Sequence, residues 1–446
     1  MTPGARLSAA IEICLEIQDE GTATDRTVDA YFKKRRYAGS KDRRAISNRV
    51  YDVIRSQSRL DWWIERSGSN LTPSPRLRII ADLCLSDKMR PEEVQTLFSG
   101  ATHCPDVMDE GETALAGALA GRPLTHHTDM PDWVAYEYPQ WLDSRLRDAF
   151  GENFEAEIAA FNLPASPDIR VNMLKATFEG VQEMLQGAQI NAAPTAYSPT
   201  ALRITDNVRL GGTKVFSDGF IEVQDEGSQL ISLLCDAGPG MTVIDFCAGA
   251  GGKTLAMAAT MTRGTNNKGK TIKGQLIACD VFSQRLERMK SRLKRADANG
   301  IQMKTLSTED DPWVAANADV ADRVLLDVPC TGTGTWRREP DAKWRLHPED
   351  MEKVINTQKR ILTSASRLVK PGGRLIYATC SVLPDENEKQ VEWFLSENPA
   401  FRTLDVPGVW ASTIGDNCPV SSPWLRLSPA STQTDGFFCA VLERTS

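Results

Sequence analysis

Hydrophobic residues recur every three or four positions through the first third of the chain, as they do along one face of an α-helix. Leu7, Ile11 and Cys14 form one such face. Loop-forming sequences such as TPSP at 72–75 separate the helical stretches, and the alternation typical of strands is scarce. Residues 1–145 are therefore predicted to form an all-α domain.

The pattern changes after residue 145, where short apolar runs typical of strands appear between helical stretches. DIRVNML at 168–174 predicts a strand, and FEGVQEMLQG at 178–187 predicts a helix. The segment 220–235 predicts a second strand that leads directly into a helix. We therefore expect residues 146–235 to form a small α+β subdomain.

From residue 236 onward, predicted strands and helices alternate, which favours an α/β fold with a Rossmann-like parallel sheet over 236–446. The run at 322–329 is apolar on both faces, as a central strand should be. A long helix is expected from Glu349 to the Pro-Gly-Gly sequence at 371–373, and the polar stretch 262–274 is expected to form a loop. The predicted strands are 241–247, 274–280, 302–307, 322–329, 374–380 and 436–443.

Composition adds few constraints to this picture. A chain of 446 residues with 41% hydrophobic and 25% charged residues is typical of a globular protein with two or three domains. The amino terminus has no signal-peptide pattern, and no apolar run approaches the roughly 20 residues of a membrane span, so we expect a cytoplasmic protein. Ten scattered cysteines without a CxxC pair, and only four histidines, favour a metal-free protein, which we expect to be a monomer.

Charge is distributed unevenly along the chain. The net charge of −7 argues against an indiscriminate nucleic-acid binder, but residues 26–60 carry eleven Lys and Arg against three Asp. A local excess of this kind can hold a phosphate backbone inside an acidic protein. Such clusters also occur on ordinary solvated helical faces, so charge alone leaves both interpretations open.

The glycine-rich sequence CAGAGGKT at 247–254 follows the first strand of the predicted sheet. It lacks the first glycine of a P-loop, where Cys247 stands, and the third glycine of a dinucleotide loop, where Thr254 stands. Ligands of doubly wound sheets bind at the carboxyl ends of strands, and Asp280 ends the second strand, where a carboxylate can accept hydrogen bonds from both ribose hydroxyls. These features predict an adenosine-containing cofactor, with a plain connector and a helix-capping Asp as the alternative.

Two cysteines follow the fourth and fifth predicted strands. Cys330 lies in LLDVPCTGTGT, and Cys380 lies in YATCSVLPDENE. A lone unpaired Cys is usually a packing residue. Two of them at the ends of neighbouring strands favour chemistry in one crevice beside the cofactor.

Six stretches follow one another in the order of a known family: RVNMLK (170–175), VQDEGSQL (223–230), DFCAGAGGKT (245–254), DRVLLDVPCTGTGTWRREPDAKW (322–344), YATCSVLPDENE (377–388) and DGFFCAVL (435–442). They resemble the RsmB-type members of the Sun/Fmu family, which are S-adenosylmethionine-dependent RNA cytosine-C5 methyltransferases with a class I methyltransferase fold. The paired PC and TCS motifs are highly specific. The stretch at 41–64 resembles the NusB-like RNA-binding domain of this type, which favours a ribosomal-RNA contact for the basic cluster.

The resemblance implies a role for each motif in a reaction that yields 5-methylcytosine. Carbon 5 of cytosine is a poor nucleophile, and a thiolate that adds to carbon 6 turns the ring into an enamine that attacks the methyl group. Cys380 would be that nucleophile, Cys330 would assist its release, and Asp327 would bind the cytosine edge. Lys253 would contact the same base or simply start a helix; both remain open.

The resemblance also implies where the cofactor and the RNA bind. Asp280 would hold the ribose, Glu309 or Asp310 would lie at the adenine, and Asp327 would lie beside the cofactor. Four residues that follow Cys330 would form a basic-aromatic loop that holds a splayed-out nucleotide, although the two tryptophans could equally pack. These four are Trp336, Arg337, Arg338 and Trp344, and the cofactor loop comprises Cys247, Ala248, Gly249, Ala250, Gly251, Gly252 and Lys253.

The expected substrate is 16S ribosomal RNA. A transfer-RNA substrate is the alternative within the same class. A non-catalytic RNA-binding assembly factor is the alternative from another class, but such a protein would be expected to lack Cys380 or Asp327, and both are present. A DNA cytosine methyltransferase needs no second cysteine, so the Cys380 motif argues against it.

Overall fold

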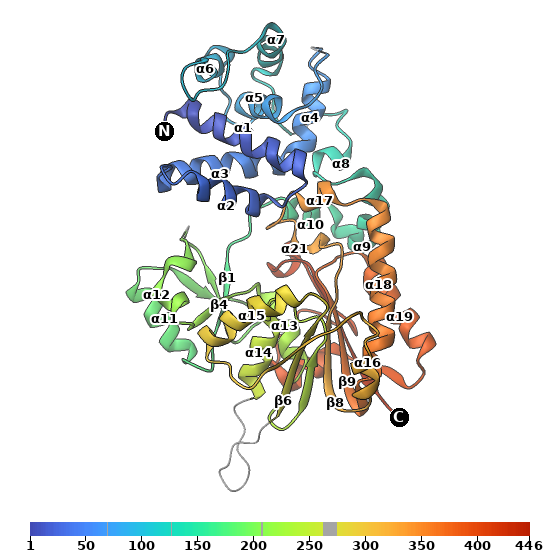
Figure 1. Ribbon diagram of the computed structural model, residues 1–446. Helices are drawn as coiled ribbons and strands as arrows, with labels where there is room; N and C mark the ends of the chain where they lie inside the picture. Colours follow the sequence, from blue (N-terminus) through green and yellow to red (C-terminus); the bar gives the residue numbers. More distant parts are fainter. Residues whose placement is uncertain (69, 126, 207, 262–273) are drawn as a thin grey trace. The chain divides into compact units, whose positions relative to one another are not determined.

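The computed structural model describes residues 1–68, 70–125, 127–206, 208–261 and 274–446, and they form two compact units (Figure 1). One unit comprises Met1–Leu163 together with Trp336–Leu346, and the other comprises Pro164–Thr335 and His347–Ser446. The loop predicted at 262–274 lies outside the described residues except for Gly274. The domain boundaries predicted after residues 145 and 235 stay predictions.

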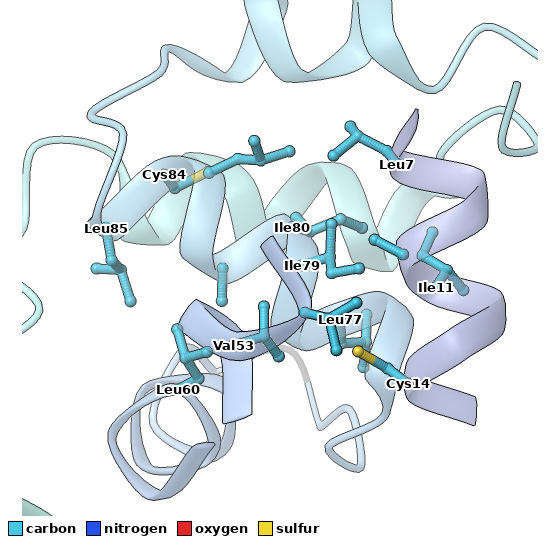
Figure 2. Close-up of a cluster of buried hydrophobic side chains, with 14 of the residues drawn as sticks. Leu7, Ile11, Cys14, Val53, Leu60, Leu77, Ile79, Ile80, Cys84 and Leu85 are labelled. Carbon is cyan, nitrogen blue, oxygen red and sulfur yellow. The ribbon is translucent and has the colours of Figure 1, made fainter. Parts of the chain in front are cut away.

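The first unit is helical, as predicted. Its first helix begins where Thr2 accepts a hydrogen bond from the Ala5 N–H, and it ends at Gly21, which has a φ of +60°. The apolar face predicted from Leu7, Ile11 and Cys14 packs into one core with side chains of the following helices (Figure 2). The helices are α1 (Pro3–Glu20), α2 (Thr24–Lys34), α3 (Ser40–Arg55), α4 (Gln57–Glu65), α5 (Pro75–Leu85), α6 (Pro91–Leu97), α7 (Glu110–Leu119), α8 (Asp132–Ala135), α9 (Asp143–Phe150), α10 (Phe154–Phe161) and α17 (Ala342–Arg345), with short 3₁₀ helices η1 (Gln140–Leu142) and η2 (Gly151–Asn153).

The segment Trp336–Leu346 belongs to the helical unit although its neighbours in sequence do not. Trp336 is buried and its ring packs against Phe161. The Trp344 indole N–H donates to the carbonyl of Ile54, and the buried Lys343 donates to the Asn162 side chain at 2.6 Å. Of the two roles predicted for Trp336, packing is therefore the one that the structure supports.

The second unit begins with a small antiparallel sheet in the strand order β2-β3-β1-β4. Its core includes Ile169 from β1, Leu202 from β3 and Val181 from the helix predicted at 178–187. The small α+β subdomain is therefore present, but its second and third strands were not predicted. Its elements are β1 (Asp168–Val171), α11 (Phe178–Gly187), β2 (Ala192–Pro194), β3 (Ala201–Ile204), η3 (Leu210–Gly212), α12 (Lys214–Ser217), β4 (Ile221–Val223) and α13 (Glu226–Leu234).

The remainder of this unit is a doubly wound sheet in the order β10-β12-β9-β8-β5-β6-β7, with β11 paired to β12. Strands β5 to β9 pair in parallel and β12 is antiparallel to β9, so the predicted Rossmann-like fold is confirmed. Leu325 of β8 packs into one core and Val324 into another, as expected of a central strand. The strands are β5 (Thr242–Asp245), β6 (Gln275–Asp280), β7 (Gln302–Thr305), β8 (Ala321–Asp327), β9 (Val369–Thr379), β10 (Phe401–Leu404), β11 (Leu425–Leu427) and β12 (Phe437–Arg444).

Helices lie on both faces of this sheet (Figure 1). None of the helices in the described ranges is long and apolar enough to cross a membrane. The described residues also contain no cluster of His, Cys, Asp and Glu that could hold a metal ion. The helices are α14 (Gly252–Met261), α15 (Ser283–Ala296), α16 (Pro312–Ala316), α18 (Pro348–Ser366), α19 (Glu388–Glu397), α20 (Val406–Thr413) and α21 (Pro429–Thr432), with η4 (Thr333–Thr335) and η5 (Pro384–Glu386).

The predicted end of the long helix at 371–373 is wrong. Helix α18 ends at Ser366, and the Pro-Gly-Gly sequence lies inside β9. The pairing of β8 with β9 shifts there, from Ala321 opposite Val369 to Arg323 opposite Arg374. The extra residues form a bulge in which Gly372 has a φ of +76°, so this sequence bends a strand instead of terminating a helix.

Candidate active site

The glycine loop connects β5 to α14 and needs glycine for steric reasons. The Ala248 N–H donates to the carbonyl of Cys279 at 2.8 Å, which ties the loop to β6. Gly251 has a φ of +82°, and a Cβ atom there would lie 2.5 Å from Met289. A Cβ atom on Gly249 would meet no described protein atom within 4 Å, so this side of the loop is open.

Two arginines hold the carbonyl oxygens of the loop. Arg292 of α15 donates to Ala250 O at 2.9 Å and also binds the buried Glu222 of β4. Arg170 of β1 donates to Gly252 O at 2.8 Å, and its burial lowers the pKa of the guanidinium to about 10. Neither arginine was predicted from the sequence, although an arginine inside the strand-like DIRVNML run was a usable signal.

Two buried carboxylates line the same loop. Asp280 accepts hydrogen bonds from the Gly249 N–H at 2.9 Å and from the Phe282 N–H at 2.8 Å. Asp245, at the end of β5, accepts from the Thr254 hydroxyl at 2.6 Å through Oδ2, while its buried Oδ1 has no hydrogen-bond partner within the described part of the chain. An orphaned buried acceptor beside an open glycine loop fits a ligand that brings its own donors, such as an ammonium group or ribose hydroxyls. The residues therefore fit the predicted adenosine-containing cofactor.

Glu309 and Asp310, the two candidates for the adenine contact, are both engaged in ion pairs, one with an arginine of α18 and one with the arginine that follows this helix. Glu309 pairs with Arg360, and Asp310 pairs with Arg367. The neighbouring Asp311 caps α16 through the Trp313 N–H. The adenine contact of Glu309 or Asp310 stays a prediction.

Lys253 and Asp327 join the first turn of α14 to the end of β8. The Lys253 ammonium donates to Asp327 Oδ2 at 2.7 Å, and about one third of the Asp327 side chain is exposed. Burial acts to lower the pKa of Lys253, but Asp327 outweighs it, and Cys380 adds to the effect, so the pKa is raised. Lys253 is therefore a stable cation close to both the carboxylate and the sulfur.

The structure brings Cys330 and Cys380 together. Strands β8 and β9 are parallel neighbours, with Asp327 opposite Ala378, so the loops that follow them lie side by side. The two sulfur atoms are 3.2 Å apart, within hydrogen-bond distance. The hydrogen bond with Cys380, together with burial, raises the pKa of Cys330 well above its ordinary value. Cys330 therefore keeps its proton, and it can donate that proton to a thiolate on Cys380.

The buried Asp245 should make stability depend on pH. Burial raises its pKa to about 7, so the folded chain binds a proton that the unfolded chain releases above about pH 4. The protonation of Asp245 therefore adds to the free energy of unfolding. This contribution is fully present below about pH 4 and is lost as the pH rises to about 7. Asp245→Asn cannot ionise, and its unfolding free energy relative to wild type should therefore increase over this range, by about 4 kcal/mol at most. Urea unfolding at pH 4.5 and pH 8 measures the difference.

A control variant should show the opposite sign. Burial acts to raise the pKa of Asp322, but its bond to Lys370 prevails and the pKa is lowered. Asp322→Asn should therefore lose stability relative to wild type as the pH rises toward about 4, and its difference from wild type should be the same at pH 4.5 and pH 8. If the unfolding free energies of wild type and Asp245→Asn changed equally between pH 4.5 and pH 8, the assignment of a neutral Asp245 would be wrong.

The strand order, the glycine loop after β5 and the acid at the end of β6 together define a Rossmann-like, class I methyltransferase. Comparison with known families agrees. The chain belongs to the family described as 16S rRNA methyltransferase RsmB/F, whose model matches residues 232–443, and the predicted RsmB-type membership is confirmed. A second family model, an RsmF/B-like ferredoxin-like domain, matches residues 138–210. S-adenosylmethionine is therefore the cofactor.

Similarity to known proteins extends over the whole chain. It is 30% identical to the probable ribosomal RNA small subunit methyltransferase B of Synechocystis sp., and the match covers 98% of each chain. It is 33% identical to the ribosomal RNA small subunit methyltransferase B of Citrobacter koseri, again over 98% of each chain. Among solved structures, the chain is similar to the crystal structure of PH0851, with a TM-score of 0.77 and 28% sequence identity. The match covers 100% of this chain and 99% of that one.

Proposed function

We propose that this protein transfers a methyl group from S-adenosylmethionine to carbon 5 of a cytosine in 16S ribosomal RNA, through a covalent bond between Cys380 and the cytosine. The pair of sulfur atoms 3.2 Å apart, beside the Lys253–Asp327 pair, carries the proposal. The names of the full-length relatives support ribosomal RNA as the substrate. A nucleophile alone would account for one of the two cysteines. A mechanism in which one cysteine adds to the cytosine and the other assists its release accounts for both.

Cofactor binding is assigned to groups around the glycine loop. Asp280 would bind the ribose hydroxyls, and the open face at Gly249 would admit the ligand. The partnerless oxygen of Asp245 would accept a hydrogen bond from the ammonium group of the cofactor. When bound, S-adenosylmethionine supplies a methyl group that is activated by the positive charge on its sulfur.

The first step assigned to the protein is addition of the Cys380 thiolate to carbon 6 of cytosine. The bond between sulfur and carbon 6 forms as the double bond between carbons 5 and 6 opens, which makes carbon 5 nucleophilic. Asp327 would accept a hydrogen bond from the ring edge and favour protonation of ring nitrogen 3. The Lys253 ammonium, bound to Asp327 at 2.7 Å, would hold this carboxylate in place beside the sulfur.

The second step is release of the methylated base. The proton on carbon 5 leaves, the double bond to carbon 6 forms again, and the bond between carbon 6 and Cys380 breaks to return the thiolate. Cys330 is assigned to this step through a water molecule: the water accepts the carbon 5 proton, and the Cys330 thiol holds that water and donates a hydrogen bond to the departing Cys380 thiolate. Its sulfur lies close enough to Cys380 to act on the same ring.

The substrate can be tested in cells. Bisulfite sequencing of total RNA from a deletion strain should show the loss of one 5-methylcytosine in 16S ribosomal RNA and its return on complementation. Loss of a methylated cytosine in transfer RNA instead would support the alternative substrate. No change in either RNA would contradict the proposed activity.

The structure divides the basic cluster of residues 26–60 into two groups. Arg35 pairs with Glu12 and stacks on the ring of Tyr31, and Arg43 donates to the carbonyl of Ala38. These two arginines support the helical fold. Six basic side chains are exposed to solvent on α2, on α3 and between them, and they are Arg26, Lys33, Lys34, Arg36, Lys41 and Arg44. We assign the RNA contact to four of them: Lys33, Lys34, Arg36 and Lys41.

Replacing these four exposed side chains by Gln should weaken RNA binding about 10-fold or more. It should also lower the slope of log affinity against log salt by up to about 3 to 4, because each of four phosphate contacts contributes about 0.7 to 0.9. Filter binding at several salt concentrations measures both. The double variant Lys88→Gln/Arg90→Gln, elsewhere on the helical unit, is the control and should change neither value. Unchanged RNA binding in the fourfold variant would contradict this contact surface.

A further inference from the structure

One buried carboxylate, that of Glu386 in η5, is hydrogen-bonded to the residues that follow both cysteines. Glu386 is fully buried. Through Oε2 it accepts from the Thr331 N–H at 2.9 Å, and through Oε1 it accepts from the Thr331 hydroxyl and from the Ser381 hydroxyl at 2.5 Å. Thr331 follows Cys330 and Ser381 follows Cys380. A single side chain therefore bridges the loop after β8 and the loop after β9, which we call the two catalytic loops.

A third element also contacts this carboxylate. The Gln358 amide of α18 donates to Glu386 Oε2 at 3.0 Å and to the carbonyl of Pro329 at 3.0 Å. Pro329 directly precedes Cys330, so this loop is held on both sides of its cysteine. Burial raises the pKa of Glu386, and the hydrogen bonds from Ser381 and Thr331 offset only part of this rise.

Further bonds connect the same loops. The Thr333 hydroxyl lies 3.0 Å from that of Ser381, and the Gly334 N–H donates to the carbonyl of Cys380 at 2.9 Å. Glu386 differs from these contacts because it receives four bonds at one buried group. Removing a group of this kind leaves several buried donors without partners, which costs far more than the loss of a surface bond.

We propose that Glu386 is a positioning residue that sets the distance between the Cys330 and Cys380 sulfur atoms. The inference rests on the proposed function for its catalytic meaning. Addition and release act on one cytosine ring, so both sulfurs must lie within reach of it at the same time. A displacement of about 1 Å in such an arrangement can cost about 100-fold in rate. Glu386 thus acts through Thr331 and Ser381 and does not itself touch the substrate.

Two variants and one control test the role in catalysis. Glu386→Ala should lower kcat for RNA methylation about 100-fold. Glu386→Gln keeps the shape and one acceptor oxygen, and should lower kcat less. The affinity for S-adenosylmethionine, measured by calorimetry, should stay unchanged in both. The control is Asp385→Asn, which removes the adjacent carboxylate that pairs with the exposed Lys389, and it should retain wild-type kcat.

A second readout tests the sulfur geometry without RNA. Phenylarsine oxide joins two neighbouring thiols through its arsenic atom and releases water, so it should protect Cys380 from iodoacetamide. Peptide mass spectrometry measures this protection at Cys380, and Cys330→Ser, which lacks the second thiol, provides the background. The arsenical concentration for half protection should be similar in wild type and Asp385→Asn, but at least about 10-fold higher in Glu386→Ala and raised less in Glu386→Gln.

The outcomes separate this inference from the proposed function. Folded Glu386→Gln and Glu386→Ala proteins with wild-type protection, or with wild-type kcat, would overturn the positioning role. Weaker protection in both variants together with lower kcat would support it. If wild-type protein methylates no RNA but the variants still lose protection, the role in setting the sulfur distance stands and the proposed function fails.

Discussion

Cys380→Ala is expected to abolish RNA methylation, with a loss of at least about 1000-fold in kcat. Without the sulfur no bond to carbon 6 can form, and carbon 5 of the neutral ring is too weak a nucleophile to take the methyl group. Transfer of a labelled methyl group from S-adenosylmethionine to 16S ribosomal RNA measures the effect. The affinity for the cofactor should not change, because the cofactor is assigned to the glycine loop and Asp280.

A matched control uses another cysteine. Cys418 is partly exposed, like Cys380, but lies outside the two catalytic loops, so Cys418→Ala should retain activity. If Cys380→Ala retained activity while Cys330→Ala lost it, the two roles would be reversed. If both retained activity, the covalent mechanism would be wrong.

Cys330→Ala is expected to trap the enzyme on its RNA. Addition by Cys380 and methyl transfer need no second sulfur, but release does, so the covalent protein–RNA complex should accumulate. Denaturing gel electrophoresis should show a shifted band for most of the variant protein after one turnover, and little such band for wild type. Turnover should fall at least about 100-fold, because general acid–base assistance contributes about 100- to 10,000-fold.

The double variant Cys330→Ala/Cys380→Ala supplies the control, since it should form no covalent complex. A complex that persists in the double variant would show that another residue forms the bond. A single Cys330→Ala variant that turns over normally without a trapped complex would contradict the release role.

Much of the catalytic fold could be predicted from sequence because its signals are local. The helix at 178–187 matched α11 residue for residue, and the apolar run at 322–329 became the central strand β8. The placement of Cys330 beside Cys380 followed from a general property of parallel sheets, whose adjacent strands end at the same edge. Such predictions need only the strand order, and side-chain packing does not enter.

Other features depend on partners that are distant in sequence, and these features were not predicted. Arg170 contacts the glycine loop 82 positions away, and Glu386 acts on Thr331 55 positions away. The strands β2 and β3 are short, so their alternation is weak. The Pro-Gly-Gly sequence at 371–373 has the same residues as a helix end, and only the paired strand shows that it is a bulge.

The course of residues 336–346 limits how the protein can be dissected. The polypeptide passes between the two units three times, after Leu163, Thr335 and Leu346. A fragment that starts at Pro164 keeps Trp336 and Lys343 but loses Phe161 and Asn162, which contact them in the intact chain. Without Phe161, the Trp336 ring loses a packing partner, and exposed aromatic surface favours aggregation. A soluble catalytic fragment therefore needs a short polar linker in place of residues 336–346, and the helical unit cannot be exchanged between relatives as a simple amino-terminal cassette.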